Sequence, residues 1–187
     1  RDLHANEKGV GEAKLGLNQV GAVDLMIAVG SGTIHDITRY HAYNMGIDFI
    51  SVPTAASVDG YVSTVAAMTW NGCKKSFTAV SPLVVVADTD IYSKAPLRLT
   101  ASGVSDLLGK YTALADWKIA HLVTGEYICN EICQLEYQAL DSLVASLPGL
   151  VSGDAKSYED LMYGLLLSGI AMQMTGNSRP ASGAEHH

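Results

Sequence analysis

The chain has 187 residues, of which 48% are hydrophobic and 17% charged, and its formal net charge is −7. This length allows one large or two small domains with a buried core. No apolar run reaches the roughly 18–20 residues that a membrane-spanning helix needs, and residues 1–8 lack the apolar core of a secretory signal. We therefore expect a globular, cytoplasmic protein without membrane insertion, and the acidic balance argues against nucleic acid as its main partner.

The first structural signal is a glycine-rich turn between an apolar strand, residues 24–29, and a helix from about Ile34 to Met45. The middle of the polar segment 1–23 is predicted to be a surface helix. In the turn, Gly30 and Gly32 allow a pyrophosphate to approach the backbone, and Thr33 is predicted to cap the helix, whose free N–H groups attract an anion. Strand-to-helix turns also use glycine simply to turn tightly, so this pattern alone leaves both readings open.

A second apolar run, residues 48–52, is stopped by Pro53 and completes a βαβ unit. Such a unit predicts a parallel sheet with a right-handed crossover, in which ligands bind beyond the carboxyl ends of the strands. The turn at residues 30–33 and the polar segment 54–59 both lie at that edge. A complete nucleotide-binding sheet has earlier strands, so we also expect that an N-terminal portion is absent from this chain.

The pattern changes from strands to helices along the chain. Residues 62–80 predict a hairpin around Asn71 and Gly72, and residues 82–88 a buried strand. Helices are predicted over 97–122, 126–147 and 157–175 and from near Ser182, with breaks at Gly125, Pro148-Gly149 and Gly176-Asn177. The predicted fold class is α/β, with a partial Rossmann-like dinucleotide-binding domain (1–95) followed by a truncated all-helical domain (96–187), their boundary lying near residues 93–97.

Three polar features of the helical half fit either an ordinary structural role or a functional one. Asp106 lies near the start of a predicted helix, where the helix dipole stabilises a carboxylate by about 0.3–1 kcal/mol. Lys110 is its i,i+4 partner. The ending Glu185-His186-His187 matches either a purification tag or a natural sequence cut short, and the helix entrance before it favours the second. Cys73, Cys129 and Cys133 cannot all pair with one another, so we expect reduced, structural thiols without a metal.

Four motifs in order carry a resemblance that covers essentially the whole chain: residues 30–36, 52–60, 106–117 and 178–186. With them the sequence resembles the glycerol-1-phosphate dehydrogenase family, in the branch that includes the bacterial AraM-type proteins. The wider group is the superfamily of iron-containing alcohol dehydrogenases and dehydroquinate synthase-like enzymes. The resemblance implies a metal-dependent, NAD(P)-linked oxidoreductase that interconverts dihydroxyacetone phosphate and sn-glycerol 1-phosphate, and a homo-oligomer, either a homodimer or larger.

The resemblance also implies the roles of individual residues. The NAD or NADP cofactor would contact the residues that follow the first two strands: Gly30, Gly32, Thr33, Ile34, His35, Asp36, Thr54, Ala55, Ala56, Ser57 and Ser63. Asp59 would bind substrate, and the catalytic Asp106 would bind both substrate and a divalent metal. His186 would be the second metal ligand. The family expects two further histidines beyond His187, so the chain as given should lack a complete metal site.

The chemistry agrees with this assignment. Ionising a hydroxyl of pKa near 16 at pH 7 spans about nine units, or ~12 kcal/mol, which a dication held by a carboxylate and imidazoles helps to supply. Such ligands suit zinc first, with iron or nickel as alternatives. A phosphorylated substrate needs a local cation, and Arg179, which can grip phosphate bidentately, ranks before Lys110. If its role is only structural, Arg179 instead caps the helix that ends near Thr175.

Three other functions remain as alternatives. A dehydroquinate synthase-like enzyme usually has Glu where this chain has Asp106, with a lysine three rather than four residues later. A glycerol dehydrogenase-like enzyme would reduce an unphosphorylated ketone. A catalytically silent nucleotide-binding protein is the alternative from another class.

Overall fold

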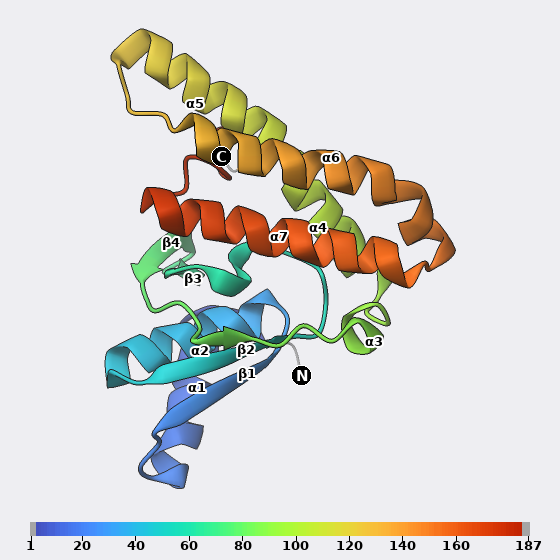
Figure 1. The fold of residues 1–187 in the computed structure, drawn as a ribbon. Helices are drawn as coiled ribbons and strands as arrows, with labels where there is room; N and C mark the ends of the chain where they lie inside the picture. The colour runs from blue at the N-terminus through green and yellow to red at the C-terminus, as the bar shows by residue number, and fades with distance from the viewer. Residues whose placement is uncertain (1–2, 185–187) are drawn as a thin grey trace. The chain divides into compact units, whose positions relative to one another are not determined.

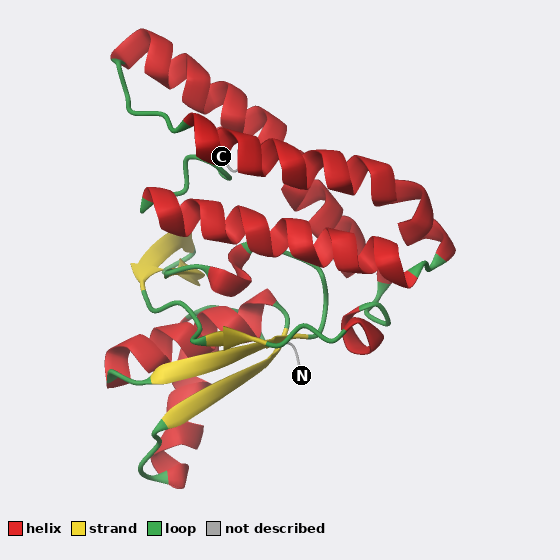
Figure 2. Ribbon diagram, viewed as in Figure 1, coloured by secondary structure: helices red, strands yellow, loops and turns green. Residues whose placement is uncertain are grey.

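The structure, a computed structural model, describes residues 3–184, and these form two compact units. The first unit comprises the described residues up to Thr54 together with 61–88, and the second comprises 55–60 and those from Thr89 onward. All strands of the described chain belong to the first unit, and the second is built of helices (Figure 2). Among these residues, no helix is long and apolar enough to span a membrane. The predicted α/β class is confirmed.

A three-stranded parallel sheet in the order β1-β2-β5 forms the base of the first unit (Figure 1). Strands β1 (Leu25–Gly30) and β2 (Asp48–Pro53) pair in parallel along their whole length, and α2 (Gly32–Met45) connects them. The predicted βαβ unit is therefore present. Alternate strand residues are buried because a strand directs successive side chains to opposite faces, and Met26, Ala28 and Phe49 pack with Ala42 of α2.

Strand β5 is shorter than the sequence predicts, with only Val84–Val85 in strand geometry. The flanking residues still follow β2, because the amide of Leu83 donates to the Phe49 carbonyl at 2.8 Å and that of Val86 to the Ser51 carbonyl at 2.8 Å. Residues 82–88 thus run beside the sheet with little regular pairing. The predicted burial of this strand is wrong, because Leu83, Val84 and Val86 are exposed.

A helix and a hairpin complete the first unit. The helix α1 (Glu7–Val20) is the predicted surface helix, and Asn6 caps it by accepting from the Gly9 amide at 3.0 Å. The predicted hairpin is also present, with β3 (Val65–Trp70) antiparallel to β4 (Cys73–Thr78). Asn71 and Gly72 both have positive φ, as a two-residue type I′ turn requires. The short 3₁₀ turn Gly60–Val62 precedes β3.

The described part of the second unit contains five helices, α3 (Thr89–Tyr92), α4 (Leu97–Leu108), α5 (Lys110–Thr124), α6 (Asn130–Ser152) and α7 (Ala155–Thr175). The single helix predicted over residues 97–122 is divided at Gly109, which keeps helical dihedral angles (φ −56°, ψ −22°). Asp106 therefore lies in the last turn of α4, and the prediction that it lies near a helix start and is favoured by the helix dipole is wrong. Gly125 and Gly176 end α5 and α7 in the left-handed conformation, as predicted. The helix predicted from near Ser182 runs into residues 185–187, outside the described part.

The predicted helix break at Pro148-Gly149 is wrong, because α6 continues through both residues and ends at Gly153 (φ +81°). Pro148 lacks the N–H that would bond the carbonyl one turn earlier, which weakens the helix without ending it. Gly149 is needed for close packing instead, since a Cβ there would overlap the Ser157 hydroxyl of α7.

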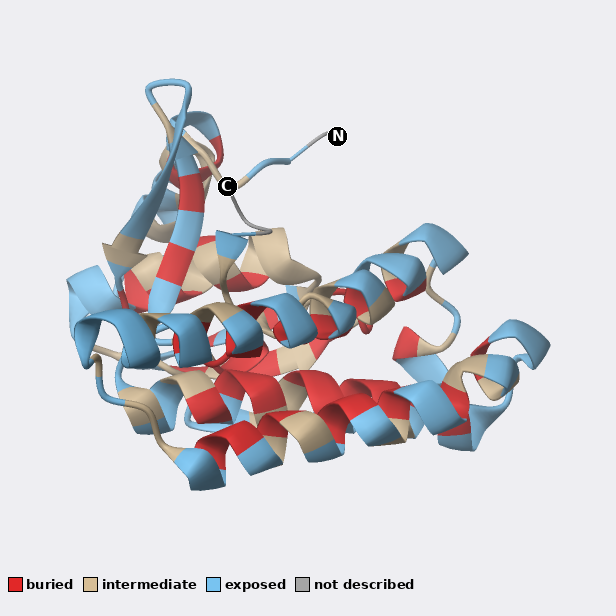
Figure 3. Cartoon of the chain, turned by 90° about the horizontal axis from the view of Figure 1, so that it is seen from above, coloured by how far each residue is buried: buried red, intermediate tan, exposed pale blue. Residues whose placement is uncertain are grey.

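Helices α6 and α7 each bury one side and expose the other (Figure 3). Their buried residues share a core with α5, in which Trp117 and Leu140 are almost fully inaccessible and Ala171 of α7 lies beside them. All three cysteines are free, and Cys133 belongs to this core.

We expect Gly149→Ala to lower the free energy of unfolding by about 1–3 kcal/mol, because the new methyl group must push α7 away from α6. Chemical denaturation measures this change. Gly16→Ala in α1 is the matched control, since a Cβ at that helical position meets open space and should stabilise by up to about 1 kcal/mol. Equal effects of the two substitutions would contradict the packing role of Gly149.

Candidate functional site

The predicted phosphate-binding turn lies between β1 and α2, at the carboxyl end of the parallel sheet. A Cβ on Gly30 would lie 2.5 Å from the Ile34 side chain, so this glycine allows α2 to pack closely against the strand end. Ser31 occupies the N-cap position, and Thr33 lies inside the first turn, so the predicted capping role of Thr33 is wrong. The amides of Gly32 and Thr33 belong to the first turn of α2, where helical N–H groups have no partner within the helix.

His35 is a buried structural residue in this turn. Its Nδ1 lies 2.9 Å from the Ser31 carbonyl oxygen and its Nε2 lies 2.8 Å from the Ser51 hydroxyl of β2. Burial lowers the pKa of His35 to about 4, so the ring is neutral at pH 7. Because both ring nitrogens are engaged, a cofactor contact at this position would fall to the backbone rather than to the imidazole.

Asp36 forms an ion pair with Arg39 one helical turn later, at 3.6 Å. Burial raises the pKa of Asp36 to about 6, against the opposing effect of the guanidinium, and burial lowers the pKa of Arg39 to about 10. Arg39 also donates to the carbonyls of Tyr61 and Ser63. The predicted cofactor residues Asp36 and Ser63 therefore help to fix this edge of the first unit.

The second motif is shared between the two units. Thr54 belongs to the first, where its amide donates to the Gly30 carbonyl at 2.9 Å, and Ala55, Ala56 and Ser57 belong to the second and are buried there. A Cβ on Gly103 would overlap the carbonyl oxygen of Ala56. The glycine thus lets α4 pack directly on the backbone of residues 55–60, which positions Asp59.

Asp59, Asp106 and Lys110 form a buried charge network. The Lys110 ammonium, whose side chain is 1% exposed, lies 2.8 Å from Asp59 Oδ2 and 3.2 Å from Asp106 Oδ1. The backbone amide of Asp59 donates to Asp106 Oδ2 at 2.8 Å. Burial opposes the charge of Lys110, but the two carboxylates outweigh it and raise the pKa of the ammonium, so Lys110 is charged at neutral pH.

Glu136 and Ser168 extend this network, and the sequence reasoning missed both. The Ser168 hydroxyl of α7 lies 3.1 Å from Asp59 Oδ2 and 3.0 Å from Glu136 Oε1 of α6. Burial raises the pKa of Glu136 to about 7, although Lys110 acts in the opposite direction. The available signal was helical periodicity, because Glu136 shares the buried face of Ile132, Ala139 and Leu143. A carboxyl group on such a face requires a polar partner.

A cavity of about 700 Å³ opens on Asp106. Its lining comes from segment 55–60, from α4 and from the residue that follows α4: Ser57, Val58, Arg98, Ala101, Ser102, Ser105, Asp106 and Gly109. Arg98 was not among the predicted site residues. It lies eight positions before Asp106, and the spacing of these α4 residues, i, i+3, i+4, i+7 and i+8, could have identified it from the sequence.

Arg179 lies elsewhere in the second unit and is 44% exposed. Its guanidinium donates to both carboxylate oxygens of Glu126, at 2.7 and 2.8 Å. This bidentate pair occupies the groups that the sequence analysis assigned to a substrate phosphate. It also differs from the structural role predicted from the sequence, in which Arg179 caps α7.

Asp106 fits the role of one oxygen ligand to a divalent metal. Each of its carboxylate oxygens accepts one hydrogen bond and keeps a further lone pair, and the cavity reaches this side chain. The predicted second ligand, His186, lies outside the described residues. Within residues 3–184, no group of three or more histidine, cysteine or acidic side chains is arranged to hold a metal.

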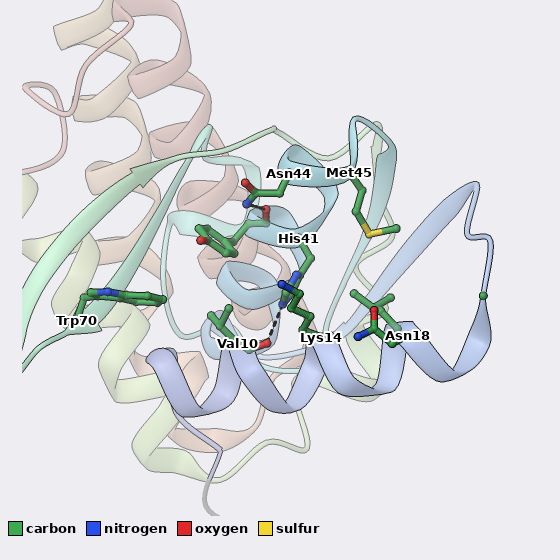
Figure 4. A pocket seen from close by; sticks show the side chains of 10 residues that line it. Val10, Lys14, Asn18, His41, Asn44, Met45 and Trp70 are labelled. Carbon is green, nitrogen blue, oxygen red and sulfur yellow. Dashed lines mark hydrogen bonds between the residues drawn. The ribbon is translucent and has the colours of Figure 1, made fainter.

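Figure 4 shows another cavity, of about 710 Å³, in the first unit between α1 and α2. Lys14, Asn18, Asn44 and Trp70 contribute to its lining, and His41 is held there by Nε2 at 3.0 Å from the Val10 carbonyl oxygen. It lies toward the Met45 end of α2, whereas the glycine turn lies at the start of that helix. None of the predicted site residues lines this cavity.

Comparisons with known proteins support a common fold. A probable glycerol dehydrogenase from Sinorhizobium meliloti superposes with a TM-score of 0.80 at 20% identity, covering 98% of this chain and 53% of that one. Glycerol dehydrogenase from Schizosaccharomyces pombe gives a TM-score of 0.78 at 21% identity, covering 97% and 47%. At these identities the similarity concerns the fold alone.

Similarity in sequence is closer. Glycerol-1-phosphate dehydrogenase [NAD(P)+] of Geobacillus thermodenitrificans is 45% identical over 186 residues, which are 100% of this chain and 46% of the relative. The enzyme of the same name from Pyrococcus furiosus is 40% identical over 171 residues, covering 91% and 49%. The chain thus spans about half the length of the curated relatives it matches. The sequence pattern of the iron-containing alcohol dehydrogenases matches residues 2–96, and this chain belongs to that family.

Proposed function

We propose that the whole protein is a metal-dependent, NAD(P)-linked oxidoreductase that interconverts dihydroxyacetone phosphate and sn-glycerol 1-phosphate. The observation that carries this proposal is the buried network of Asp59, Lys110 and Asp106 beside a cavity of substrate size. It occurs in a chain that is 45% identical along its length to a protein named glycerol-1-phosphate dehydrogenase. We further propose a cytoplasmic homo-oligomer.

The nicotinamide cofactor would bind at the carboxyl edge of the β1-β2 sheet. Its pyrophosphate would accept hydrogen bonds from the first amides of α2, at Gly32 and Thr33, where the helix dipole favours an anion. The arrangement suits NAD or NADP equally, because it concerns only the pyrophosphate that both contain.

Asp106 would hold the metal from α4, with His186 as a second ligand. A bound zinc, iron or nickel ion would supply positive charge next to the substrate oxygen and so favour its ionised form. The chain's own residues hold Asp106 in place, because the Lys110 ammonium and the Asp59 amide each donate a hydrogen bond to its side chain. Asp59, whose side chain is fixed by Lys110, would orient a substrate hydroxyl.

The substrate phosphate would be held by a cation on the cavity wall, for which we now propose Arg98. It lines the same cavity as Asp106, and no carboxylate within residues 3–184 forms an ion pair with it. Arg179 would first have to leave Glu126, and Lys110 is already shared between two carboxylates. Both remain candidates, and the kinetic experiment below compares Arg179 with Arg98.

Asp106→Asn in the whole protein should lower turnover at least about 100-fold, because an amide binds a divalent metal much less well than a carboxylate. A coupled assay with dihydroxyacetone phosphate and NADH or NADPH, with and without chelator, measures this loss. Nucleotide affinity should stay within about threefold, since the turn at Gly30 belongs to the other unit. Asp141→Asn, at an exposed position of α6, is the control for the same chemical change. Normal turnover, or equal loss of metal and nucleotide, would count against this role.

Arg98→Gln should raise KM for dihydroxyacetone phosphate at least tenfold, equivalent to about 1.4 kcal/mol of binding, and change KM for dihydroxyacetone little. Steady-state kinetics with both ketones makes the comparison. Arg179→Gln is the matched variant, and its effect should be the smaller because Glu126 occupies that guanidinium. A larger selective effect at Arg179 would move the phosphate contact there, and equal losses for both ketones would make Arg98 structural.

Two alternatives are separated by the same assays. A glycerol dehydrogenase-like enzyme, suggested by the names of the similar folds, would prefer unphosphorylated dihydroxyacetone. A silent nucleotide-binding protein would retain nucleotide binding, bind no divalent metal and turn over neither ketone.

A further inference from the structure

We propose that Glu136 is a neutral carboxylic acid that donates a hydrogen bond to Ser168, whose hydroxyl then donates to Asp59. In this chain of hydrogen bonds, Glu136 acts as a positioning residue that fixes the Asp59 carboxylate beside Lys110. The significance for catalysis rests on the proposed function, whereas the protonation state of Glu136 can be tested without any activity.

Ser168 has one hydroxyl hydrogen but contacts two carboxyl groups. Ser168 Oγ lies within hydrogen-bond distance of two carboxyl oxygens, Asp59 Oδ2 at 3.1 Å and Glu136 Oε1 at 3.0 Å. A hydroxyl group has a single hydrogen to donate, and an ionised carboxylate can only accept. With both carboxyls ionised, one of these two contacts would bring two acceptors together. One carboxyl must therefore carry a proton and donate it to Ser168.

The surroundings of the two carboxyls indicate which one holds the proton. Burial raises the pKa of the Asp59 carboxyl, but the Lys110 ammonium, 2.8 Å from Asp59 Oδ2, acts in the opposite direction and favours a carboxylate there. No cation contacts Glu136 among the described residues, and its second oxygen, Oε2, is buried without a hydrogen-bond partner in that part of the chain. A full negative charge on Glu136 would leave that oxygen unsolvated, which is much costlier than a neutral carboxyl oxygen in the same position.

The total charge of the network also favours a neutral Glu136. Ionised Asp59 and Asp106 with the Lys110 ammonium sum to −1, and ionised Glu136 would make the sum −2 in a buried region. The remaining titratable neighbour is Cys133 of α6, where burial raises the pKa of the thiol and so keeps it neutral. Burial likewise raises the pKa of Glu136, to about 7.

This hydrogen-bond chain makes the site sensitive to pH. Below about pH 7, Asp59 Oδ2 accepts from both Ser168 and Lys110, which fixes the carboxylate. When Glu136 ionises, it becomes an acceptor and competes with Asp59 for the single hydrogen of Ser168. Asp59 then loses one of its two side-chain donors, and the substrate position loses part of its preorganisation.

The direct test is infrared difference spectroscopy of the whole protein at about pH 6. Only a protonated carboxyl group has the carbonyl stretch of a carboxylic acid, and Glu136→Gln should remove one such band. Asp59→Asn is the matched variant and should leave that band in place. Loss of the band in Asp59→Asn but not in Glu136→Gln, or no loss in either, would overturn the proposal.

Chemical denaturation as a function of pH gives an independent test. Glu136 keeps its proton up to about pH 7 when folded but loses it near the ordinary value of 4.5 when unfolded. Because the folded protein holds the extra proton between these values, stability relative to Glu136→Gln is greatest below pH 4.5 and is lost as pH rises through 7. The ratio of the unfolding constants, wild type over variant, should rise about 200-fold between about pH 4 and 8. A ratio that does not change with pH would contradict a neutral Glu136.

The pH profile of kcat/KM separates a positioning role from a merely structural one. Wild-type activity should fall as pH rises through about 7, and this step should be absent from Glu136→Gln, whose amide donates to Ser168 at every pH. Ser168→Ala should lower kcat/KM throughout and also lack the step. If the step persists in Glu136→Gln, the positioning role is wrong. If neither ketone is turned over, the proposed function fails, and the spectroscopic and denaturation tests still decide the state of Glu136.

Discussion

The candidate site depends on one interaction, the contact of a buried ammonium with two carboxylates. Lys110 is 1% exposed, and removing its charge from water is costly unless close partners compensate. Asp59 and Asp106 provide that compensation, and each is in turn held by a second donor, Ser168 and the Asp59 amide respectively. With Glu136 of α6, the network joins residues from one loop and four helices, so the orientation of each side chain depends on the others.

Close backbone packing makes this network possible. Gly103 lets α4 contact the carbonyl of Ala56, which brings Asp59 to Asp106, and Gly164 lies where a Cβ would come within 2.9 Å of Leu107. These positions use the missing side chain of glycine rather than its freedom to adopt positive φ. In the first unit, Gly30 serves the same purpose next to Ile34, so a glycine in the motif indicates tight packing as well as access for a phosphate.

Some motif residues support the fold through internal contacts, and others face a cavity. The side chains of His35 and Asp36 make internal contacts within the first unit, and that of Ser63 accepts from the Val65 amide, whereas Asp106 faces a cavity. A motif residue can therefore be essential to a site without touching a ligand. Arg98 was not a predicted site residue, yet it lines the cavity from a regular position of α4.

The sequence by itself determined the βαβ unit, the hairpin turn and the helix ends near Met45, Thr124 and Thr175, because hydrophobic periodicity and turn residues such as Asn71 and Gly72 act locally. It also predicted the pairing of Asp106 with Lys110 and the family to which the chain belongs. Only the tertiary structure decided that α6 continues through Pro148, that Arg179 pairs with Glu126, and that Glu136 and Ser168 join Asp59. These outcomes depend on contacts between residues distant in sequence, for instance Asp59 and Ser168, which are 109 positions apart. Local propensity contains no information about such contacts, because their energy exists only once the helices have packed.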